Sequence, residues 1–131
     1  MLTIFVVDDS GDCRRPLARL LESEGYEAVC LSNGREALIA LEKSSEESSP
    51  ALILLDISMP VMDGLTFLSI LRGDHRWESM PVIVLSGDSD GPLERARELG
   101  AHDVLVKSAF SAGHLLASIR RHLAPPGQDP S

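Results

Sequence analysis

Three carboxylates, a hydroxyl and an ammonium stand where apolar runs of this sequence end. Asp8 and Asp9 follow the first run, Asp56 the third, Ser86 the fourth and Lys107 the fifth. Two unit charges ~4 Å apart repel by about 4 kcal/mol at an effective dielectric of about 20, so clustered carboxylates must be partly protonated or hold a cation. Oxygen ligands without His or Cys nearby favour a hard ion, and we expect Mg²⁺. One carboxylate beside that ion could attack a phosphoryl group, while the ammonium neutralises the phosphoryl oxygens.

The elements that must bring these residues together alternate along the chain. Short runs rich in Val, Ile and Leu are separated by segments in which Leu and Ala recur at helical spacing. The strand-like runs are Leu2–Val7, Glu27–Leu31, Ala51–Leu55, Pro81–Leu85 and Val104–Val106. This repeated β-α pattern predicts parallel strands joined by right-handed crossovers, with helices on both faces of the sheet. Because ligands bind beyond the carboxyl ends of such strands, the polar residues should converge at one edge.

Composition limits the classes of partner. The chain has 131 residues, the length of one domain, and a formal net charge of −8 at pH 7. This acidic balance argues against electrostatic binding of nucleic acid or of an anionic membrane, because both need clustered Lys and Arg. No basic signal peptide opens the sequence, and no apolar run reaches the ~18 residues of a membrane span. We therefore expect a cytoplasmic protein with no nucleic-acid and no membrane partner.

Other reactive or polar side chains fit structural roles. The two cysteines have neither the density of a disulfide scaffold nor CxxC spacing, so Cys13 should be a helix-face thiol and Cys30 a small core residue. Trp77 lies in a charged loop and should be a surface or partly packed aromatic. Four histidines lack the spacing of metal ligands and should lie at the surface: His75, His102, His114 and His122.

The chain divides into a domain and a short tail. Gly100 should end the fourth helix as its C′ residue, where a left-handed backbone is common. After Leu123 the sequence Ala-Pro-Pro-Gly-Gln-Asp-Pro-Ser offers no core-forming side chains. We expect one domain over residues 1–123 and a disordered tail or linker stub over residues 124–131.

Four groups of residues together resemble a known family. In this order and spacing, they resemble the receiver domains of two-component response regulators: Val6–Ser10, Leu54–Gly64, Leu85–Gly87 and Gly100–Lys107. The resemblance covers about residues 2–123. It implies a single (βα)5 flavodoxin-like domain, in which a five-stranded parallel sheet has the order 2-1-3-4-5 and helices cover both faces.

The resemblance also implies a reaction. Asp56 would accept a phosphoryl group from a phosphohistidine on a sensor histidine kinase or a histidine phosphotransfer protein. Asp9, Asp56 and the backbone carbonyl of Ser58 would bind Mg²⁺, and Asp8 would assist through a water molecule. A receiver of this kind is not a conventional enzyme, although it catalyses its own aspartyl phosphorylation and dephosphorylation.

Two residues would act on the phosphate, and two others depart from the family's pattern. Lys107 would pair with the phosphate and Ser86 would hydrogen-bond it. Where the family usually carries Tyr or Phe, this chain has Val104, and where a Pro usually follows the lysine it has Ser108. A non-proline cis peptide costs ~2.5–4 kcal/mol, so we expect a trans bond before Ser108. These departures leave the phosphorylation chemistry in place but bear on the output switch.

Two other functions remain open. A phosphorylation-independent interaction module with the same fold is the alternative that Val104 and Ser108 favour. A phosphatase with an aspartyl nucleophile is less favoured, because Ser58 stands where such enzymes carry a second Asp. No glycine-rich nucleotide motif follows a strand. The resemblance implies an output surface over about Pro92–Leu123 for a downstream protein partner that the sequence does not identify.

Overall fold

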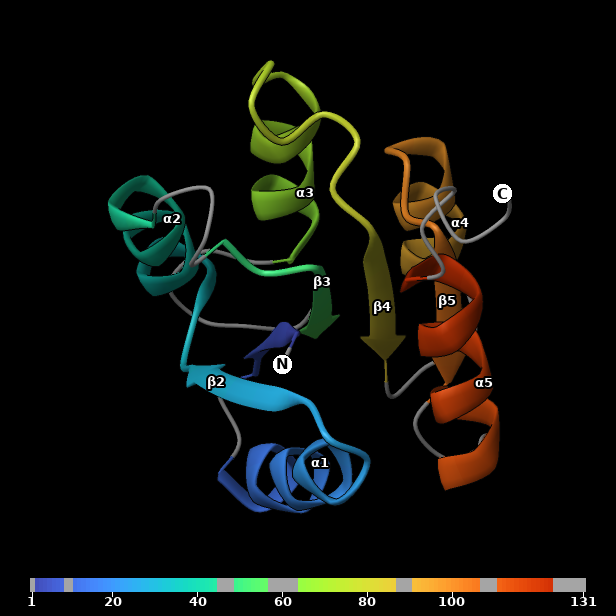
Figure 1. Ribbon diagram of the computed structural model, residues 1–131. Helices are drawn as coiled ribbons and strands as arrows, with labels where there is room; N and C mark the ends of the chain where they lie inside the picture. The colour runs from blue at the N-terminus through green and yellow to red at the C-terminus, as the bar shows by residue number, and fades with distance from the viewer. Residues whose placement is uncertain are drawn as a thin grey trace, which may run out of the picture.

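The computed structural model describes residues 2–8, 11–44, 49–56, 64–86, 91–106 and 111–123, with the backbone alone at residues 11–14, 64, 86 and 91–93. Strands and helices alternate along the chain (Figure 1). The strands are β1 (Thr3–Val7), β2 (Glu27–Leu31), β3 (Leu52–Asp56), β4 (Val82–Ser86) and β5 (Asp103–Val106). The helices are α1 (Gly11–Ser23), α2 (Gly34–Lys43), α3 (Gly64–Arg72), α4 (Gly91–Glu98) and α5 (Ala112–Leu123).

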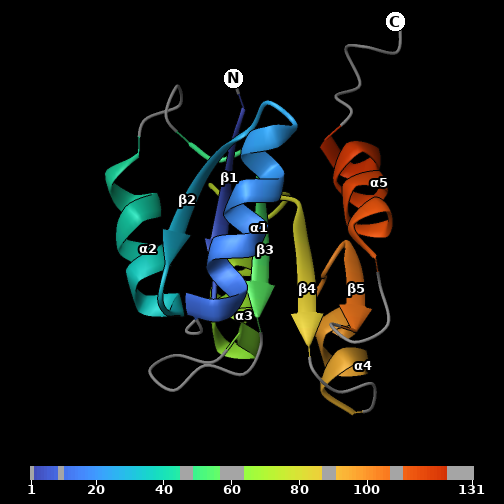
Figure 2. The ribbon, with the colours of Figure 1, turned by 90° about the horizontal axis from the view of Figure 1, so that it is seen from below.

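The strands form one parallel sheet in the order β2-β1-β3-β4-β5. All the strand arrows in Figure 2 point the same way, so the carboxyl ends lie along one edge. The predicted α/β fold, with the flavodoxin-like order 2-1-3-4-5, is confirmed. Two strands extend one residue further than the apolar runs did: Asp56 pairs in register with Leu85, and Ser86 with Val106. Both polar residues are therefore held by the sheet ladder.

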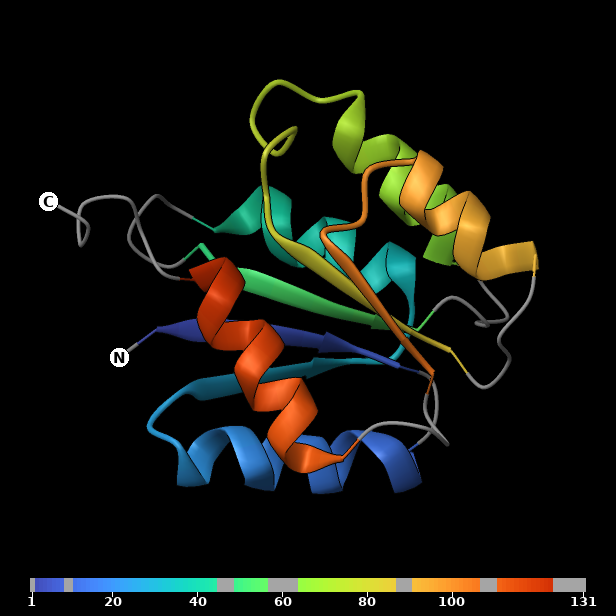
Figure 3. The ribbon, with the colours of Figure 1, turned by 90° about the vertical axis from the view of Figure 1, so that its right-hand side faces the viewer.

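Helices cover both faces of the sheet, as Figure 3 shows. Ile4 and Val6 of β1 pack with buried residues of α1 and α5, while Phe5 and Val7 pack with those of α2, α3 and α4. This division follows from the two-residue period of a strand, which sends alternate side chains to opposite faces. The central strands are consequently buried on both sides, which explains their continuous apolar sequence.

Cys30 corrects one prediction, because it is exposed and does not lie in the core. It belongs to β2, which is an edge strand paired only with β1. An edge strand is covered less completely than a central one, and β2 has no fully buried residue. The apolar run Ala28–Leu31 suggested a core position for Cys30, because composition alone does not show which side chains an edge strand leaves exposed.

Trp77 corrects a second prediction, because it is buried, with 6% of its surface exposed. One side of the indole packs into the core of the α2, α3 and α4 face. The guanidinium of Arg76 lies 4.1 Å from the ring centroid and also pairs with Asp74 and Glu42, at 2.8 and 2.9 Å. Hydrogen bonds from Arg76 lower the pKa of Asp74 to about 2. The charged neighbours that suggested a surface position instead form the cover of a buried ring.

Arg72 joins three segments at the opposite edge of the sheet, where the strands begin. It ends α3 and donates hydrogen bonds to the backbone carbonyls of Trp77, Met80 and Gly100, at 3.1, 2.9 and 2.9 Å. Gly100 ends α4 in a Schellman motif with φ of +100°, as predicted for a C′ residue. A Cβ at Gly100 would lie 2.8 Å from Arg72 Nε, so the close approach also requires glycine.

The groups around the ring of His102 lower its pKa. The backbone N–H of Val82 donates to His102 Nδ1 at 3.3 Å, and Arg72 Nη2 lies 3.4 Å from the same nitrogen. Because both neighbours are donors, Nδ1 must offer its lone pair. The ring of His122 lies edge-on, with the centroids 5.5 Å apart. The expectation of a surface position is thus wrong for His122, which is half-buried.

This arrangement predicts a loss of stability in mild acid. Burial, the Arg72 charge and His122 lower the pKa of His102 below its ordinary value of 6.5. The unfolded chain therefore binds this proton more tightly, and the contribution to stability is lost as pH falls below about 6.5. We expect the melting temperature to fall less for His102→Gln than for the wild type when the pH is lowered from about 7.5 to about 5.5. His114→Gln, at an exposed position, is the matched control. An unchanged decrease in His102→Gln would contradict the assignment.

Candidate functional site

Asp8 and Asp56 lie side by side at the carboxyl edge of the sheet. They follow Val7 and Leu55, which pair in register on the adjacent parallel strands β1 and β3. Adjacent strands are ~4.8 Å apart, so the two carboxylates start from neighbouring positions. Asp8 is 1% exposed and Asp56 is 6% exposed. The structure therefore brings two of the predicted carboxylates together in a buried setting.

The local sequence explains why these two carboxylates are held firmly. Leu52–Leu55 of β3 are all buried, which fixes the strand that ends in Asp56. The backbone N–H of Asp8 donates to the carbonyl of Leu31 at 3.0 Å, so the β1–β2 ladder continues one residue past β1. A site built on strands of a packed sheet is held more rigidly than one built on loops alone.

The other predicted site residues are described in part or not at all. Ser86 ends β4, one residue beyond the register partner of Asp56, and its side chain is not described. Its own register partner, Val106, is the last residue of β5 and directly precedes Lys107. Asp9, Ser58 and Lys107 lie outside the described residues. The ends of β1, β3, β4 and β5 are nevertheless consecutive along this edge.

The donor set at this edge suits a hard cation. Burying one carboxylate is costly, and burying two at neighbouring strand ends adds their mutual repulsion. A bound divalent ion would offset both costs, and carboxylate oxygens are the ligands that Mg²⁺ prefers. Within the described residues no three His, Cys, Asp or Glu side chains gather to form a metal site. Asp9, the third predicted carboxylate, is not among those residues.

Ser118 makes a buried polar contact between α5 and β5 that the sequence pattern did not predict. It is buried in α5, and its hydroxyl donates to Asp103 Oδ2 at 2.5 Å, while Asp103 Oδ1 accepts from the backbone N–H of Val104 at 2.9 Å. The bond fastens α5 to the strand that leads to Lys107. The available signal was a hydroxyl within the apolar stripe of α5, between Leu115 and Ile119.

Val104 occupies the place where the resembling family usually carries an aromatic residue. Its side chain is buried and belongs to the core cluster that includes Ala96 of α4. A β-branched side chain has few χ1 rotamers and no polar end to draw it toward solvent. Val104 therefore cannot alternate between a buried and an exposed position as a tyrosine could.

None of the helices in the described ranges is both long enough and apolar enough to cross a bilayer. The longest described helix, α1, has 13 residues. A span requires about 20 predominantly apolar residues.

Comparison with known proteins identifies a family. Residues 4–120 match the family described as the response regulator receiver domain. Protein PilG of Pseudomonas aeruginosa is 32% identical over 124 residues, which cover 93% of this chain and 87% of PilG. Sensory transduction protein RegX3 of Mycobacterium bovis is 34% identical over 132 residues, which cover all of this chain and 55% of RegX3. This chain thus spans about half the length of RegX3.

Solved structures with a fold similar to that of this chain are signalling proteins as well. The chemotaxis protein CheY4 of Vibrio cholerae has a TM-score of 0.81 at 30% identity, with 92% of this chain and 98% of CheY4 covered. The signal receiver domain of a signal transduction histidine kinase from Syntrophus aciditrophicus has a TM-score of 0.85 at 32% identity, with 100% of this chain and 95% of that domain covered.

Proposed function

Because this chain belongs to the response regulator receiver domain family, we propose that it is the phosphoacceptor of a two-component phosphorelay. The donor is a phosphohistidine on a sensor histidine kinase or a histidine phosphotransfer protein, and the acceptor is Asp56. The observation that carries the proposal is the buried carboxylate of Asp56, at the end of a central strand and beside Asp8. The relay switches protein–protein contacts, and the protein acts in the cytoplasm.

The reaction exchanges one bond to phosphorus for another. A carboxylate oxygen of Asp56 attacks the phosphorus, the P–N bond breaks, and the imidazole leaves with the electron pair. In the return step water attacks the phosphorus of the acyl phosphate, the P–O bond to Asp56 breaks, and inorganic phosphate leaves. Lys107 neutralises charge on the phosphoryl oxygens, and Ser86 donates a hydrogen bond to the bound phosphate.

A divalent cation fits this site. Asp9, Asp56 and the backbone carbonyl of Ser58 would hold Mg²⁺, and Asp8 would contribute through a water molecule. The ion supplies positive charge that offsets the two buried carboxylates and the incoming phosphoryl group. The buried strand β3 holds the acceptor oxygen of Asp56 at a fixed place on the sheet edge.

The labelling reaction tests the proposal directly. We expect the protein, incubated with Mg²⁺ and acetyl phosphate, to gain one base-labile phosphoryl group, measured by intact mass before and after alkaline treatment. Chelation with EDTA should lower the labelled fraction at least about tenfold, because the positive charge that the ion supplies against the anionic donor is then absent. Absence of labelling, or labelling that EDTA leaves unchanged, would contradict the proposal.

A phosphorylation-independent interaction module is the second candidate, favoured by the buried aliphatic Val104. In that case phosphorylation would leave the amide NMR signals of α4 and β5 where they are. A receiver that switches would shift them. Recording the spectrum before and after labelling with acetyl phosphate distinguishes the two functions.

A further inference from the structure

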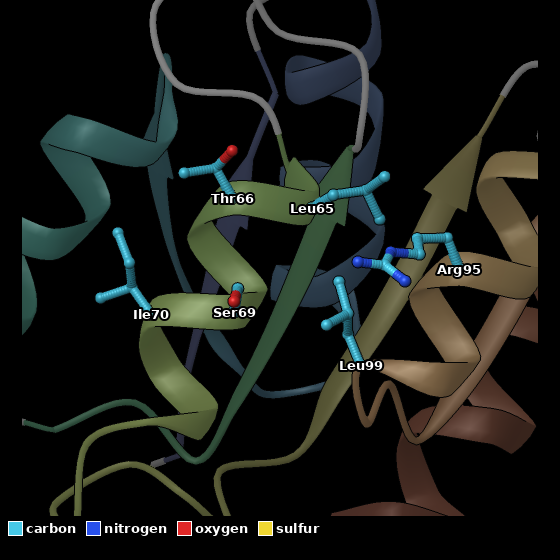
Figure 4. A pocket seen from close by; sticks show the side chains of 6 residues that line it. All are labelled: Leu65, Thr66, Ser69, Ile70, Arg95 and Leu99. Atoms are coloured by element: carbon cyan, nitrogen blue, oxygen red, sulfur yellow. The ribbon is translucent and has the colours of Figure 1, made fainter.

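A groove lies between α3 and α4. It has a volume of about 290 Å³ and is lined by Leu65, Thr66, Ser69 and Ile70 of α3 with Arg95 of α4 and Leu99 just after it. Figure 4 shows Leu65 reaching across from α3 toward Arg95, with Leu99 between the two helices. Thr66 and Ile70 continue the same surface across α3 toward α2. Ile70 is 39% exposed, one of the few large apolar side chains left in water among those that the structure describes.

The size and shape of the groove argue for a protein segment. Sites that enclose small molecules usually measure roughly 300–1,000 Å³ and bury most of the ligand. This groove is at the lower limit, and Thr66, Ser69, Ile70 and Arg95 along it are exposed. Two antiparallel or crossing helices with aliphatic side chains between them form the groove that accepts a third, amphipathic helix.

The charge in the groove indicates which helix would fit. Of the lining side chains that the structure describes, none is acidic, and Arg95 carries a positive charge. Its described ion pair, with Glu98 at 3.6 Å, joins two largely exposed side chains. Such a pair contributes little and exchanges readily for another carboxylate. Glu94 and Glu98 of the same helix are not among the described lining side chains, so Arg95 is the charged group that faces an occupant of the groove.

We propose that the α3–α4 groove binds an acidic amphipathic helix of a partner protein, with aliphatic side chains against Leu65, Leu99 and Ile70 and a carboxylate on Arg95. A second copy of this chain is the competing occupant, and sedimentation of the chain alone tests for it. The proposal does not depend on phosphorylation of Asp56. It adds a docking surface to the proposed receiver function.

Binding of two matched peptides tests the proposal. The probe is an acetylated and amidated helical peptide with Leu at positions i, i+3, i+4 and i+7 and Glu on the flanks, and its counterpart carries Lys in place of Glu. We expect only the acidic peptide to shift the amide NMR signals of Leu65, Ser69 and Leu99 in the full chain. Shifts confined to other elements, or equal binding of the basic peptide, would overturn the proposal, as would absence of binding by the acidic peptide.

Two pairs of variants separate the groove from general surface effects. Arg95→Glu should weaken binding of the acidic peptide about fivefold or more, because a favourable contact becomes a repulsive one. Arg97→Glu makes the same charge change on α4 at an exposed residue outside the groove lining, and it should leave the affinity within about twofold. Ile70→Gln should weaken binding, whereas Ile39→Gln on α2, 47% exposed and also outside the lining, should not. Equal effects within either pair would overturn the proposal.

Self-association is the remaining outcome to examine. Sedimentation of the chain without peptide should show a monomer over the concentrations used for NMR. A dimer that Arg95→Glu or Ile70→Gln dissociates would mean that the groove binds a second copy, and the proposed partner helix would be wrong.

Discussion

Asp56→Asn is expected to remove phosphorylation by acetyl phosphate, with a decrease in the labelled fraction of at least about 100-fold, because the amide has no nucleophilic carboxylate oxygen. Intact mass after incubation with Mg²⁺ measures this directly. Asp74→Asn is the matched control, since Asp74 pairs with Arg76 at the opposite edge of the sheet. We expect that variant to label as the wild type does. Equal labelling of wild type and Asp56→Asn would remove Asp56 as the acceptor.

We expect Asp56→Asn to leave the folded protein at least as stable as the wild type. A loss of labelling in this variant would then not result from unfolding. Asp56 and Asp8 are buried carboxylates at neighbouring strand ends. Replacing one by a neutral amide removes part of their repulsion, so in EDTA the variant should melt no lower than the wild type. Added Mg²⁺ should raise the melting temperature of the wild type more than that of Asp56→Asn, because a cation that binds the folded state stabilises it. A variant that is unfolded in EDTA would contradict this account of the site.

Arg72→Ala is expected to lower the free energy of unfolding by about 2–4 kcal/mol. The side chain supplies the hydrogen bonds that three backbone carbonyls accept, those of Trp77, Met80 and Gly100. Removing a charged donor costs roughly 1.5–3 kcal/mol for a single bond, and water can reach part of this half-buried site and replace some of the loss. Urea unfolding followed by circular dichroism provides the measurement.

Two further variants sharpen the Arg72 prediction. Arg72→Lys should recover only a minority of the loss, since an ammonium cannot reach three carbonyls from one planar fork. Arg97→Ala, at an exposed residue of α4, should change stability by no more than about 0.5 kcal/mol. If Arg72→Lys restores wild-type stability, positive charge alone explains the role of Arg72, and the hydrogen-bond geometry does not matter.

The paired carboxylates show how far sequence reasoning reaches at the site. Asp8 and Asp56 follow apolar runs whose period identifies them as strands, and the alternation of strands with helices requires parallel pairing. Their convergence at one edge therefore follows from the pattern alone. The burial of Asp56 within the ladder does not, because it depends on the register between β3 and β4.

Trp77 and Cys30 show where sequence reasoning fails. Trp77 is surrounded in sequence by charged residues, yet one of them, Arg76, covers the ring and the core accepts its other face. Cys30 lies in an apolar run, yet its strand is at the edge of the sheet. In both cases the packing against the core is set by segments elsewhere in the chain, and a local pattern carries no information about them.

The sequence by itself determined the order of strands and helices, the parallel sheet, and the polar residue types that stand at the strand ends, because hydrophobic periodicity and turn chemistry act over a few residues. Only the tertiary structure decided which carbonyls Arg72 bridges, that His102 meets His122, and that α3 and α4 leave a groove beside Arg95. Those features join residues from different segments, and their geometry is set by packing of the whole core.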